Sequence, residues 1–254
     1  MKTENIELVN SAGLTIRGTL WMPKPGKHPT VVIFHGLTGG YTLAWYQHII
    51  KAFTHADFIV AGFDFTNGTA TSDGNIKDLT LDQEVEDAKI IIDFLKKHPS
   101  VGPIGVFGHS LGGVVGCIIS AQDSTIASLV LSATVWDPAK ELPPLFNTTP
   151  QIWERTGAIP FPQEWSVPAK LKFQFYRSLT TYNALATAKN IKQPTLVLHG
   201  DADDVVSVEN AKNYYDALPA RKKLLIIPRG KHSYVNNTLT LAINASIEWF
   251  RQTL

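Results

Sequence analysis

The sequence has little that would cross-link the chain or hold it at a charged or lipid surface. Cys117 is the only cysteine, so no disulfide can form within the chain. The 23 basic residues are interspersed with 22 acidic ones, and the net charge of +1 leaves no basic patch for nucleic acid. No apolar run reaches the roughly 18 residues that cross a bilayer. The residues after Met1 also lack the apolar stretch of a signal peptide, so we expect a cytoplasmic protein.

What the sequence does contain is enough apolar material for one large core. Of the 254 residues, 44% are hydrophobic and 18% are charged, a balance typical of a globular protein. No linker rich in glycine and serine divides the chain, and α/β domains commonly reach about 200–250 residues. We therefore expect a single domain over residues 1–254.

The order of apolar segments predicts an α/β fold. Residues 6–9 and 14–20 alternate in polarity, as the strands of a half-buried antiparallel hairpin do. Later apolar runs show no alternation, which is typical of strands buried on both faces of a parallel sheet: 30–34, 58–63, 104–107, 128–131, 195–198 and 223–227. Helical patterns lie between or after them: 43–53, 81–95, 111–121, 208–218 and 238–250. This alternation predicts a mostly parallel sheet of about eight strands with helices on both faces.

One segment, residues 136–172, interrupts the alternation. It contains seven of the fifteen prolines and three of the six tryptophans. Proline fixes φ and lacks an N–H donor, so long regular elements are not expected there. The aromatic content argues against disorder. We expect an ordered cap, inserted within the domain, over the C-terminal edge of the sheet. The alternative is a surface excursion that does not touch the substrate.

Residues 108–112, Gly-His-Ser-Leu-Gly, fit the G-x-S-x-G pattern of a serine nucleophile. The context agrees, because a buried strand is predicted before the pattern and an apolar helix after it. A strand that turns so sharply into a helix strains the residue at the turn, and the flanking glycines let the backbones approach. The pattern therefore predicts Ser110 as the nucleophile. An ordinary turn serine is the alternative.

A serine hydroxyl needs a base to activate it and a carboxylate to orient that base. When the nucleophile stands on a sharp turn between a strand and a helix, the acid and then the histidine follow it in the chain. Only two of the eight histidines follow Ser110, and the first, His199, precedes the carboxylates of the 200–204 loop. We predict His232 as the general base and His199 as a structural residue at a strand end. The spacing leaves the acid open among Asp201, Asp203 and Asp204.

Two backbone N–H groups should face the oxyanion that forms during acyl transfer. The amide of Leu111, directly after the nucleophile, is one of them. The second is expected in the glycine-rich loop over residues 35–40, His-Gly-Leu-Thr-Gly-Gly, where Leu37 is the candidate. A strand-end turn without a catalytic part is the alternative.

Other chemistries find no support in the sequence. Cys117 falls in the apolar helix after Ser110, where a buried inert thiol is expected. No histidine, cysteine and aspartate cluster has metal-ligand spacing, and no glycine-rich loop fits a phosphate-binding or dinucleotide-binding pattern. We expect neither a metal nor a cofactor.

Together these segments resemble the α/β-hydrolase superfamily over essentially the whole chain. Residues 35–37 look like its oxyanion loop, 108–113 like its nucleophile elbow and 198–206 like its acid loop. The family's acid stands three residues after the glycine of that loop, which implies Asp203. The Gly-Lys-His segment that ends at His232 is similar to the family's Gly-x-His.

More narrowly, the sequence resembles the bacterial feruloyl and cinnamoyl esterases. Their cap is inserted between the sixth strand and the acid-bearing strand, where residues 136–172 fall. The sequence of their oxyanion loop is close to that of residues 35–39. A Phe-Tyr pair stands at a similar distance before the acid loop, which implies that Tyr176 contacts the phenolic ring of the substrate. The cap is richer in proline and tryptophan than theirs. Its other candidate substrate contacts are Asp137, Gln151 and Trp165.

The sequence thus predicts a serine carboxylesterase that hydrolyses small esters through an acyl-enzyme. Hydroxycinnamoyl esters and short-chain acyl esters are the expected substrates, because aromatic cap residues suit a flat or apolar acyl group. Alternatives are a thioesterase, a lipase-like or peptidase-like hydrolase and, in a different class, a non-catalytic ligand receptor on the same fold. The expected partner is a small-molecule ester. An exposed aromatic cap also suits a homodimer contact, which the sequence does not decide.

Overall fold

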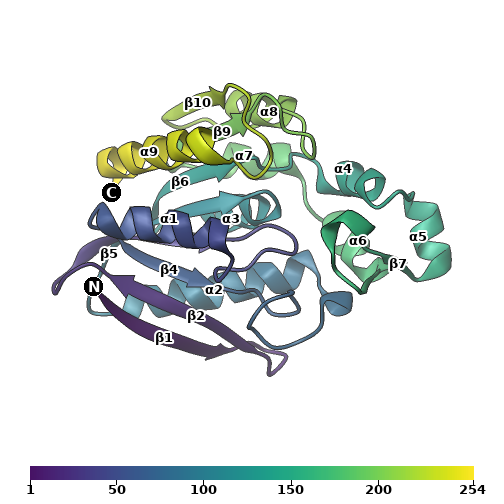
Figure 1. Ribbon diagram of the computed structural model, residues 1–254, viewed down its shortest axis with the longest axis horizontal. Helices are drawn as coiled ribbons and strands as arrows, with labels where there is room; N and C mark the ends of the chain where they lie inside the picture. The colour runs from purple at the N-terminus through teal and green to yellow at the C-terminus, as the bar shows by residue number, and fades with distance from the viewer.

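The apolar runs of the sequence form the strands of one eight-stranded sheet (Figure 1). The computed structural model describes residues 1–254. The strands are β1 (Lys2–Val9), β2 (Thr15–Met22), β3 (His28–Phe34), β4 (Ile59–Phe63), β5 (Val101–His109), β6 (Ile126–Ser132), β9 (Thr195–Gly200) and β10 (Lys222–Ile227). Their order across the sheet is β1-β2-β4-β3-β5-β6-β9-β10. β2 pairs antiparallel with β1 and β4, and all other pairs are parallel, which confirms the predicted sheet and its antiparallel N-terminal hairpin.

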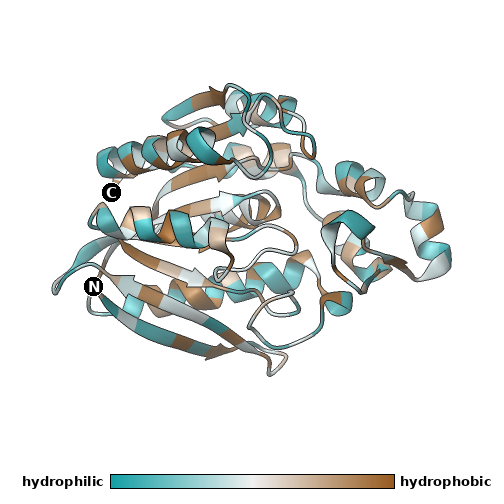
Figure 2. Cartoon of the chain, in the orientation of Figure 1, coloured by the Kyte–Doolittle hydropathy of each residue, from teal (hydrophilic) through white to brown (hydrophobic).

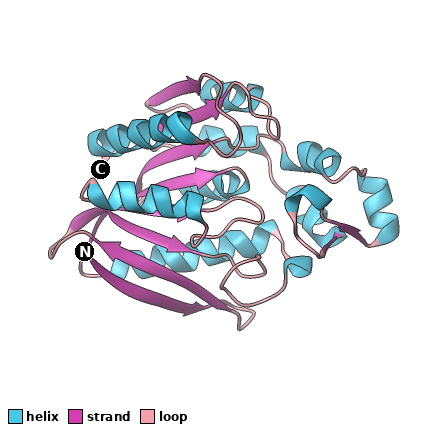
Figure 3. Ribbon diagram, viewed as in Figure 1, coloured by secondary structure: helices cyan, strands magenta, loops and turns pink.

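Helices cover both faces of the sheet, so its central strands are buried on both sides (Figures 1 and 3). One face packs against α1 (Ala44–His55) and α9 (Asn236–Thr253), around Phe53 and Phe250. The other face packs against α2 (Leu81–Lys97), α3 (Leu111–Gln122), α7 (Ala184–Asn190) and α8 (Glu209–Ala217). Hydrophobic residues, brown in Figure 2, recur along the central strands and the helices that cover them, and their side chains form the core. None of these helices combines the length and the apolar character needed to cross a membrane.

Because β3, β5, β9 and β10 run parallel, their C-terminal ends meet at one edge of the sheet. The segments that follow them at this edge are the loop after Phe34, the turn at Ser110, the loop after Gly200 and the loop that contains His232. The topology alone therefore gathers the predicted catalytic segments in one place.

The proline-rich region folds as a group of short elements that projects beyond this edge of the sheet (Figure 1). These elements are α4 (Pro138–Leu145), α5 (Pro150–Thr156), β7 (Ala158–Pro160), the 3₁₀ turn η2 (Gln163–Trp165), β8 (Lys170–Lys172) and α6 (Phe173–Leu179). We call the region from α4 to α6 the insertion. None of its helices exceeds eight residues. Proline stands at the first position of α4 and of α5, where a missing N–H costs no hydrogen bond.

The buried aromatic side chains of the insertion gather around Trp153 and are continuous with the hydrophobic core on the α2 and α3 face of the sheet. The Trp153 side chain is fully buried, and its indole N–H donates to the carbonyl of Leu171 at 3.0 Å. The rings of Phe146 and Phe175 lie 5.6 and 6.3 Å from it. The three buried rings make the segment an ordered unit despite its short elements.

Tyr214 of α8 holds both ends of the insertion. Its hydroxyl donates to the carbonyl of Val135 at 2.8 Å and accepts from the hydroxyl of Tyr182 at 2.9 Å. The ring of Trp136 packs edge-on against its ring at 4.8 Å. Asn210, one turn earlier on the same helix, accepts from the Trp136 N–H and donates to Glu141 on α4. These contacts fix where the insertion stands relative to the sheet edge.

Candidate active site

Ser110 occupies a strained turn between β5 and α3. Its backbone angles, φ of 55° and ψ of −122°, lie in a region that residues other than glycine rarely adopt. Such strain is typical of a nucleophile elbow. A Cβ on Gly108 would stand 2.6 Å from the carbonyl oxygen of Gly112, closer than real atoms approach. Glycine is therefore required where the two backbones meet, as the sequence pattern predicted.

The serine, histidine and carboxylate form one hydrogen-bonded chain. His232 Nε2 lies 3.1 Å from Ser110 Oγ, and His232 Nδ1 lies 2.9 Å from Asp203 Oδ2. These distances allow His232 to take the serine proton while the carboxylate holds the imidazole in orientation. The structure thus brings together the three residues that the sequence analysis singled out.

The structure also separates Asp203 from its two neighbours in the acid loop. Asp201 accepts from the Arg229 N–H at 2.5 Å, and the exposed Asp204 pairs with Lys231. Asp203 Oδ1 accepts from the N–H groups of Val205 and Val206, at 2.9 and 2.8 Å. These bonds turn its other oxygen toward His232.

The side chain of Asp203 is fully buried and still stays ionised. Burial raises its pKa, but hydrogen bonds from His199 and His232 outweigh burial and hold the pKa well below the ordinary value. His199 Nε2 lies 3.0 Å from Asp203 Oδ2 and 2.9 Å from the carbonyl oxygen of Val206. A carbonyl oxygen only accepts, so Nε2 carries the proton. His199 is at the strand end, as predicted, but its contact with the acid is a feature that the sequence analysis did not foresee.

The oxyanion loop after β3 is held from two sides. His35 Nδ1 donates to the carbonyl of Gly36 at 2.9 Å, while its Nε2 accepts from the Phe65 N–H at 3.0 Å. These partners require a neutral imidazole, and burial accordingly lowers the pKa of His35. The Gly36 N–H donates to the hydroxyl of Tyr46 at 2.9 Å. No periodicity in the sequence marks Tyr46 for this task, because the partner comes from a different element, α1.

The two candidate oxyanion donors line the same cavity as Ser110. The Leu37 N–H has no acceptor within the protein. Leu111 is the first residue of α3, and its N–H precedes the intrahelical hydrogen bonds. Both N–H groups are therefore free to donate a hydrogen bond to a ligand oxygen.

His109 and Trp45 form an aromatic cluster next to His232, with tilted rings. The His109 ring lies 5.0 Å from that of His232 and 4.7 Å from that of Trp45, whose indole N–H donates to the Tyr234 carbonyl. Burial, assisted by the nearby His232, lowers the pKa of His109 well below its ordinary value. A neutral ring thus packs against the His232 imidazole and would not repel it if His232 were protonated.

The cavity at Ser110 measures about 300 Å³ and lies between the sheet edge and the insertion. The core contributes the oxyanion loop, the elbow and the His232 loop, and the insertion contributes Leu142, Leu145 and Trp165. Its volume is at the lower end of the roughly 300–1,000 Å³ of ligand pockets. The cavity therefore suits a small substrate.

Of the four candidate substrate contacts in the cap, only Trp165 lines this cavity. Asp137 is exposed and caps α4, where its carboxylate accepts from the Lys140 N–H. Gln151 is exposed on α5. The Tyr176 ring stacks on Phe173 at 5.4 Å within the insertion. The structure therefore does not bring Asp137, Gln151 and Tyr176 to Ser110.

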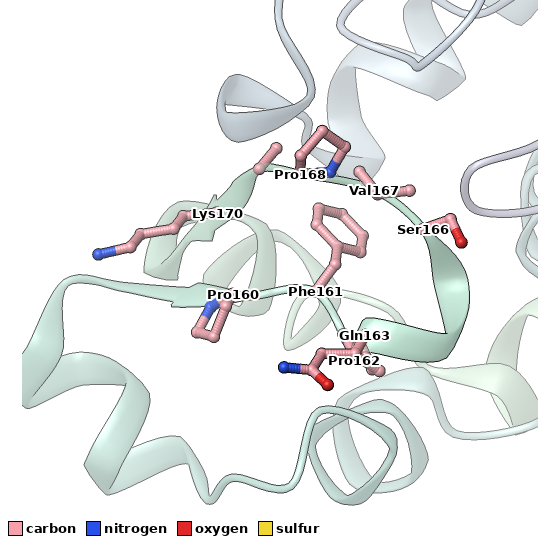
Figure 4. A pocket seen from close by; sticks show the side chains of 9 residues that line it. Pro160, Phe161, Pro162, Gln163, Ser166, Val167, Pro168 and Lys170 are labelled. Carbon is pink, nitrogen blue, oxygen red and sulfur yellow. The ribbon is translucent and has the colours of Figure 1, made fainter.

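A second and larger hollow, of about 560 Å³, lies on the insertion itself. Its lining comes entirely from residues 160–170, where Phe161 lies between Pro160 and the segment of Val167 and Pro168 (Figure 4). No residue of the hydrogen-bonded chain at Ser110 contributes to it. The chemistry of the molecule is therefore centred on the smaller cavity.

The chain matches the model of one protein family over most of its length. The family is Hydrolase_4, described as serine aminopeptidase S33, and the match covers residues 26–178 and 167–238. Among solved structures, Est1E from Butyrivibrio proteoclasticus, with ferulic acid bound, is similar over 98% of both chains, with 25% identity and a TM-score of 0.82. The fold is that of the α/β-hydrolases, as predicted.

Two relatives differ in the activity that their names state. The polyketide transferase ATR5 of Stachybotrys chlorohalonatus is 24% identical over 91% of this chain and 90% of its own. The mitochondrial palmitoyl-protein thioesterase ABHD10 of Homo sapiens is 28% identical over 71% of this chain and 59% of its own. One is a transferase by name and the other a thioesterase.

Proposed function

Because the chain belongs to the serine aminopeptidase S33 family of hydrolases, we propose that it is a serine carboxylesterase acting on small esters. The observation that carries this proposal is the chain of hydrogen bonds from Ser110 through His232 to Asp203. The Ser110 end of this chain of hydrogen bonds lies in a cavity that also holds the free N–H groups of Leu37 and Leu111. No cluster of metal-ligating side chains lies there. This is the arrangement that acyl transfer to serine needs.

Each group has a defined task in the proposed reaction. Ser110 Oγ attacks the ester carbonyl carbon as its proton passes to His232 Nε2, and the Leu37 and Leu111 N–H groups bind the oxyanion. His232 returns the proton to the leaving alcohol, and the carbonyl carbon–oxygen bond to that alcohol breaks. Water then attacks the acyl-enzyme and gives a proton to His232. Ser110 recovers that proton as the acid departs.

Two classes of acyl group fit the proposal at this level: hydroxycinnamoyl groups and short-chain acyl groups. The similarity to a structure that binds ferulic acid supports the first, and the small apolar cavity supports the second. We further propose that the insertion acts as the cap of the site, because Leu142, Leu145 and Trp165 form the cavity wall opposite Ser110.

The proposal is tested with p-nitrophenyl acetate and purified wild-type protein, Ser110→Ala and Ser11→Ala. Ser11 is exposed in the N-terminal hairpin and controls for a serine-to-alanine change away from the site. We expect Ser110→Ala to lower kcat by at least about 10³-fold and Ser11→Ala to leave it unchanged. A fluorophosphonate should label the wild type at the peptide that contains Ser110 and should not label Ser110→Ala.

A panel of other substrates separates the alternatives. The panel contains p-nitrophenyl butyrate, methyl ferulate, butyryl thioester and a p-nitroanilide. Turnover of a thioester or an anilide at far higher kcat/KM than any ester would replace the esterase assignment by a thioesterase or a peptidase. Absence of Ser110-dependent turnover on every member, in a folded protein, would refute catalysis and favour a ligand receptor.

A further inference from the structure

The polar side chains of the cavity gather at its reactive end. They belong to the oxyanion loop, the elbow, α1 and the His232 loop, and none is an aspartate, glutamate, lysine or arginine. Several are already engaged: the Tyr46 hydroxyl by the Gly36 N–H, the Trp45 indole by Tyr234, and His109 by Ser132. The remaining hydroxyls, of Thr38 and Ser233, lie on the core segments beside Ser110 and His232.

The opposite wall, contributed by the insertion, is almost entirely hydrocarbon. It consists of Leu142, Leu145 and Trp165, next to the apolar Leu43 and Val205 of the core. The only polar side-chain atom of its insertion part is the indole nitrogen of Trp165, which can donate a hydrogen bond but cannot accept one. A hydroxyl at the far end of a bound acyl group would find no side-chain acceptor for its proton on this wall.

The three polar residues that the sequence analysis named as substrate contacts, Asp137, Gln151 and Tyr176, do not line the cavity. The Asp137 carboxylate is used to cap α4, the Tyr176 ring packs on Phe173, and Gln151 is exposed. A buried hydroxyl without a partner loses a factor of about 5–150 in binding.

From this distribution of polar groups we infer that the cavity selects an unsubstituted hydrocarbon acyl group, aliphatic or aryl, and discriminates against one with a terminal hydroxyl. This inference rests on the proposed esterase function and decides between its two substrate classes. The preferred acyl groups are short alkanoyl and plain cinnamoyl groups, and the para-hydroxycinnamoyl group is disfavoured.

A matched pair of substrates tests the inference: methyl cinnamate and methyl para-coumarate, which differ by one hydroxyl. In a methyl ester only the acyl arm is large enough to fill the cavity. We expect kcat/KM to be at least about tenfold higher for methyl cinnamate. Equal values, or a preference for methyl para-coumarate, would overturn the inference.

A variant tests where the discrimination arises. Leu145 is half-buried on the insertion wall. Leu145→Asn replaces it by a side chain of similar size that carries a carbonyl oxygen. We expect the cinnamate-to-coumarate ratio to fall by at least about fivefold. Leu185→Asn makes the same change at an exposed position on α7 outside the cavity and should leave the ratio unchanged. An unchanged ratio in Leu145→Asn, with its fold intact by circular dichroism, would contradict the assignment of this wall.

The failure of this inference is distinguishable from the failure of the proposed function. If p-nitrophenyl acetate is turned over with dependence on Ser110 and para-coumarate is preferred, only the inference on the acyl group falls. If no ester is turned over with dependence on Ser110, both fall.

Discussion

His199 and His232 approach the same oxygen of the same carboxylate, Asp203 Oδ2, at 3.0 and 2.9 Å. The two histidines differ in exposure, since the His199 side chain is fully buried while 16% of the His232 side chain is exposed. His199 therefore positions the acid from inside the core, and His232 reaches from the acid to the cavity. Asp203 is held by four donors in total, because two backbone N–H groups occupy its other oxygen.

The first prediction concerns this buried histidine. His199→Leu removes one donor and leaves more negative charge on Asp203 for His232, so the acid limb of the pH profile of kcat/KM should move to higher pH. We also expect kcat to fall about 10–100-fold, because a hydrogen bond to a charged group is worth about 1.5–3 kcal/mol. His199→Gln retains an N–H donor and should recover most of both effects. If the pH profile of His199→Leu matched that of the wild type, His199 would have only a packing role.

The second prediction concerns the oxyanion loop. Tyr46→Phe keeps the ring and removes the acceptor of the Gly36 N–H, which frees the loop that carries Leu37. We expect kcat to fall about 10–100-fold with little change in KM, because an unpaired buried donor costs about 1–3 kcal/mol. Steady-state kinetics on p-nitrophenyl acetate measures this. The half-buried Tyr41, whose hydroxyl makes no hydrogen bond within the protein, provides the control Tyr41→Phe. A rise in KM alone would mean that the hydroxyl of Tyr46 contacts the substrate instead.

The third prediction concerns stability against pH. Glu84 is buried with one unpaired carboxylate oxygen, and burial, followed by the charge of Asp87, raises its pKa well above the ordinary value. A raised folded-state pKa means that stability is full below pH 4.5 and declines as pH rises through the folded-state pKa. Glu84→Gln removes this decline. We expect a free energy of unfolding about 1–3 kcal/mol above that of the wild type at pH 8, by urea titration, and a smaller difference at pH 4.5.

Glu86, on the same helix, provides the contrast with the opposite sign. Hydrogen bonds from Ser11 lower its pKa, so its contribution to stability is present above pH 4.5 and is lost as pH falls through the lowered value. Glu86→Gln should therefore lose stability at pH 8. If both variants shifted stability in the same direction, the burial of Glu84 would not be the cause.

The fourth prediction separates two glycines of α3. A Cβ on Gly112 would overlap the backbone oxygens of Phe34 and His35, which cannot move without shifting the oxyanion loop. Gly112→Ala should therefore lower both the melting temperature and kcat. At Gly116 the nearest atom is Val106 Cγ1 at 3.3 Å, and alanine favours a helix by up to about 1 kcal/mol over glycine. Gly116→Ala should leave both quantities near the wild-type values, and a comparable loss there would refute the explanation by backbone contact.

The sequence predicted the central sheet and the segments around Ser110 because both depend on local patterns. Apolar runs and the G-x-S-x-G context are readable within about ten residues, and His232 followed by elimination. The acid was different: spacing could not choose Asp203, because the direction of its side chain depends on the N–H groups of Val205 and Val206. Only the resemblance to a family identified it.

The contacts of individual side chains were the part that could not be predicted. Asp137 directly precedes Pro138, a pattern that favours the start of a helix. Its carboxylate accepts a hydrogen bond from the Lys140 N–H at the start of α4 and does not line the cavity. Tyr176 follows Phe173 by three residues on α6, and the stacking of these two rings keeps Tyr176 out of the cavity lining. The role of Tyr46 depends on Gly36, in the loop after β3, and that of His199 depends on the shape of the loop after β9, which brings Asp203 against it. No sequence pattern signals either contact.

Tyr214 contacts both ends of the insertion. Val135 and Trp136 precede the insertion, Tyr182 follows it, and all three contact the Tyr214 side chain. A loop whose two stems share a single anchor can be exchanged as a cassette. Replacement of residues 137–181 by the equivalent segment of a relative would change the hydrocarbon wall of the cavity while Ser110, Asp203 and His232 stay on the sheet edge. The architecture thus gives evolution, and protein engineers, a route to new ester preferences by recombination rather than by point mutation of the catalytic machinery.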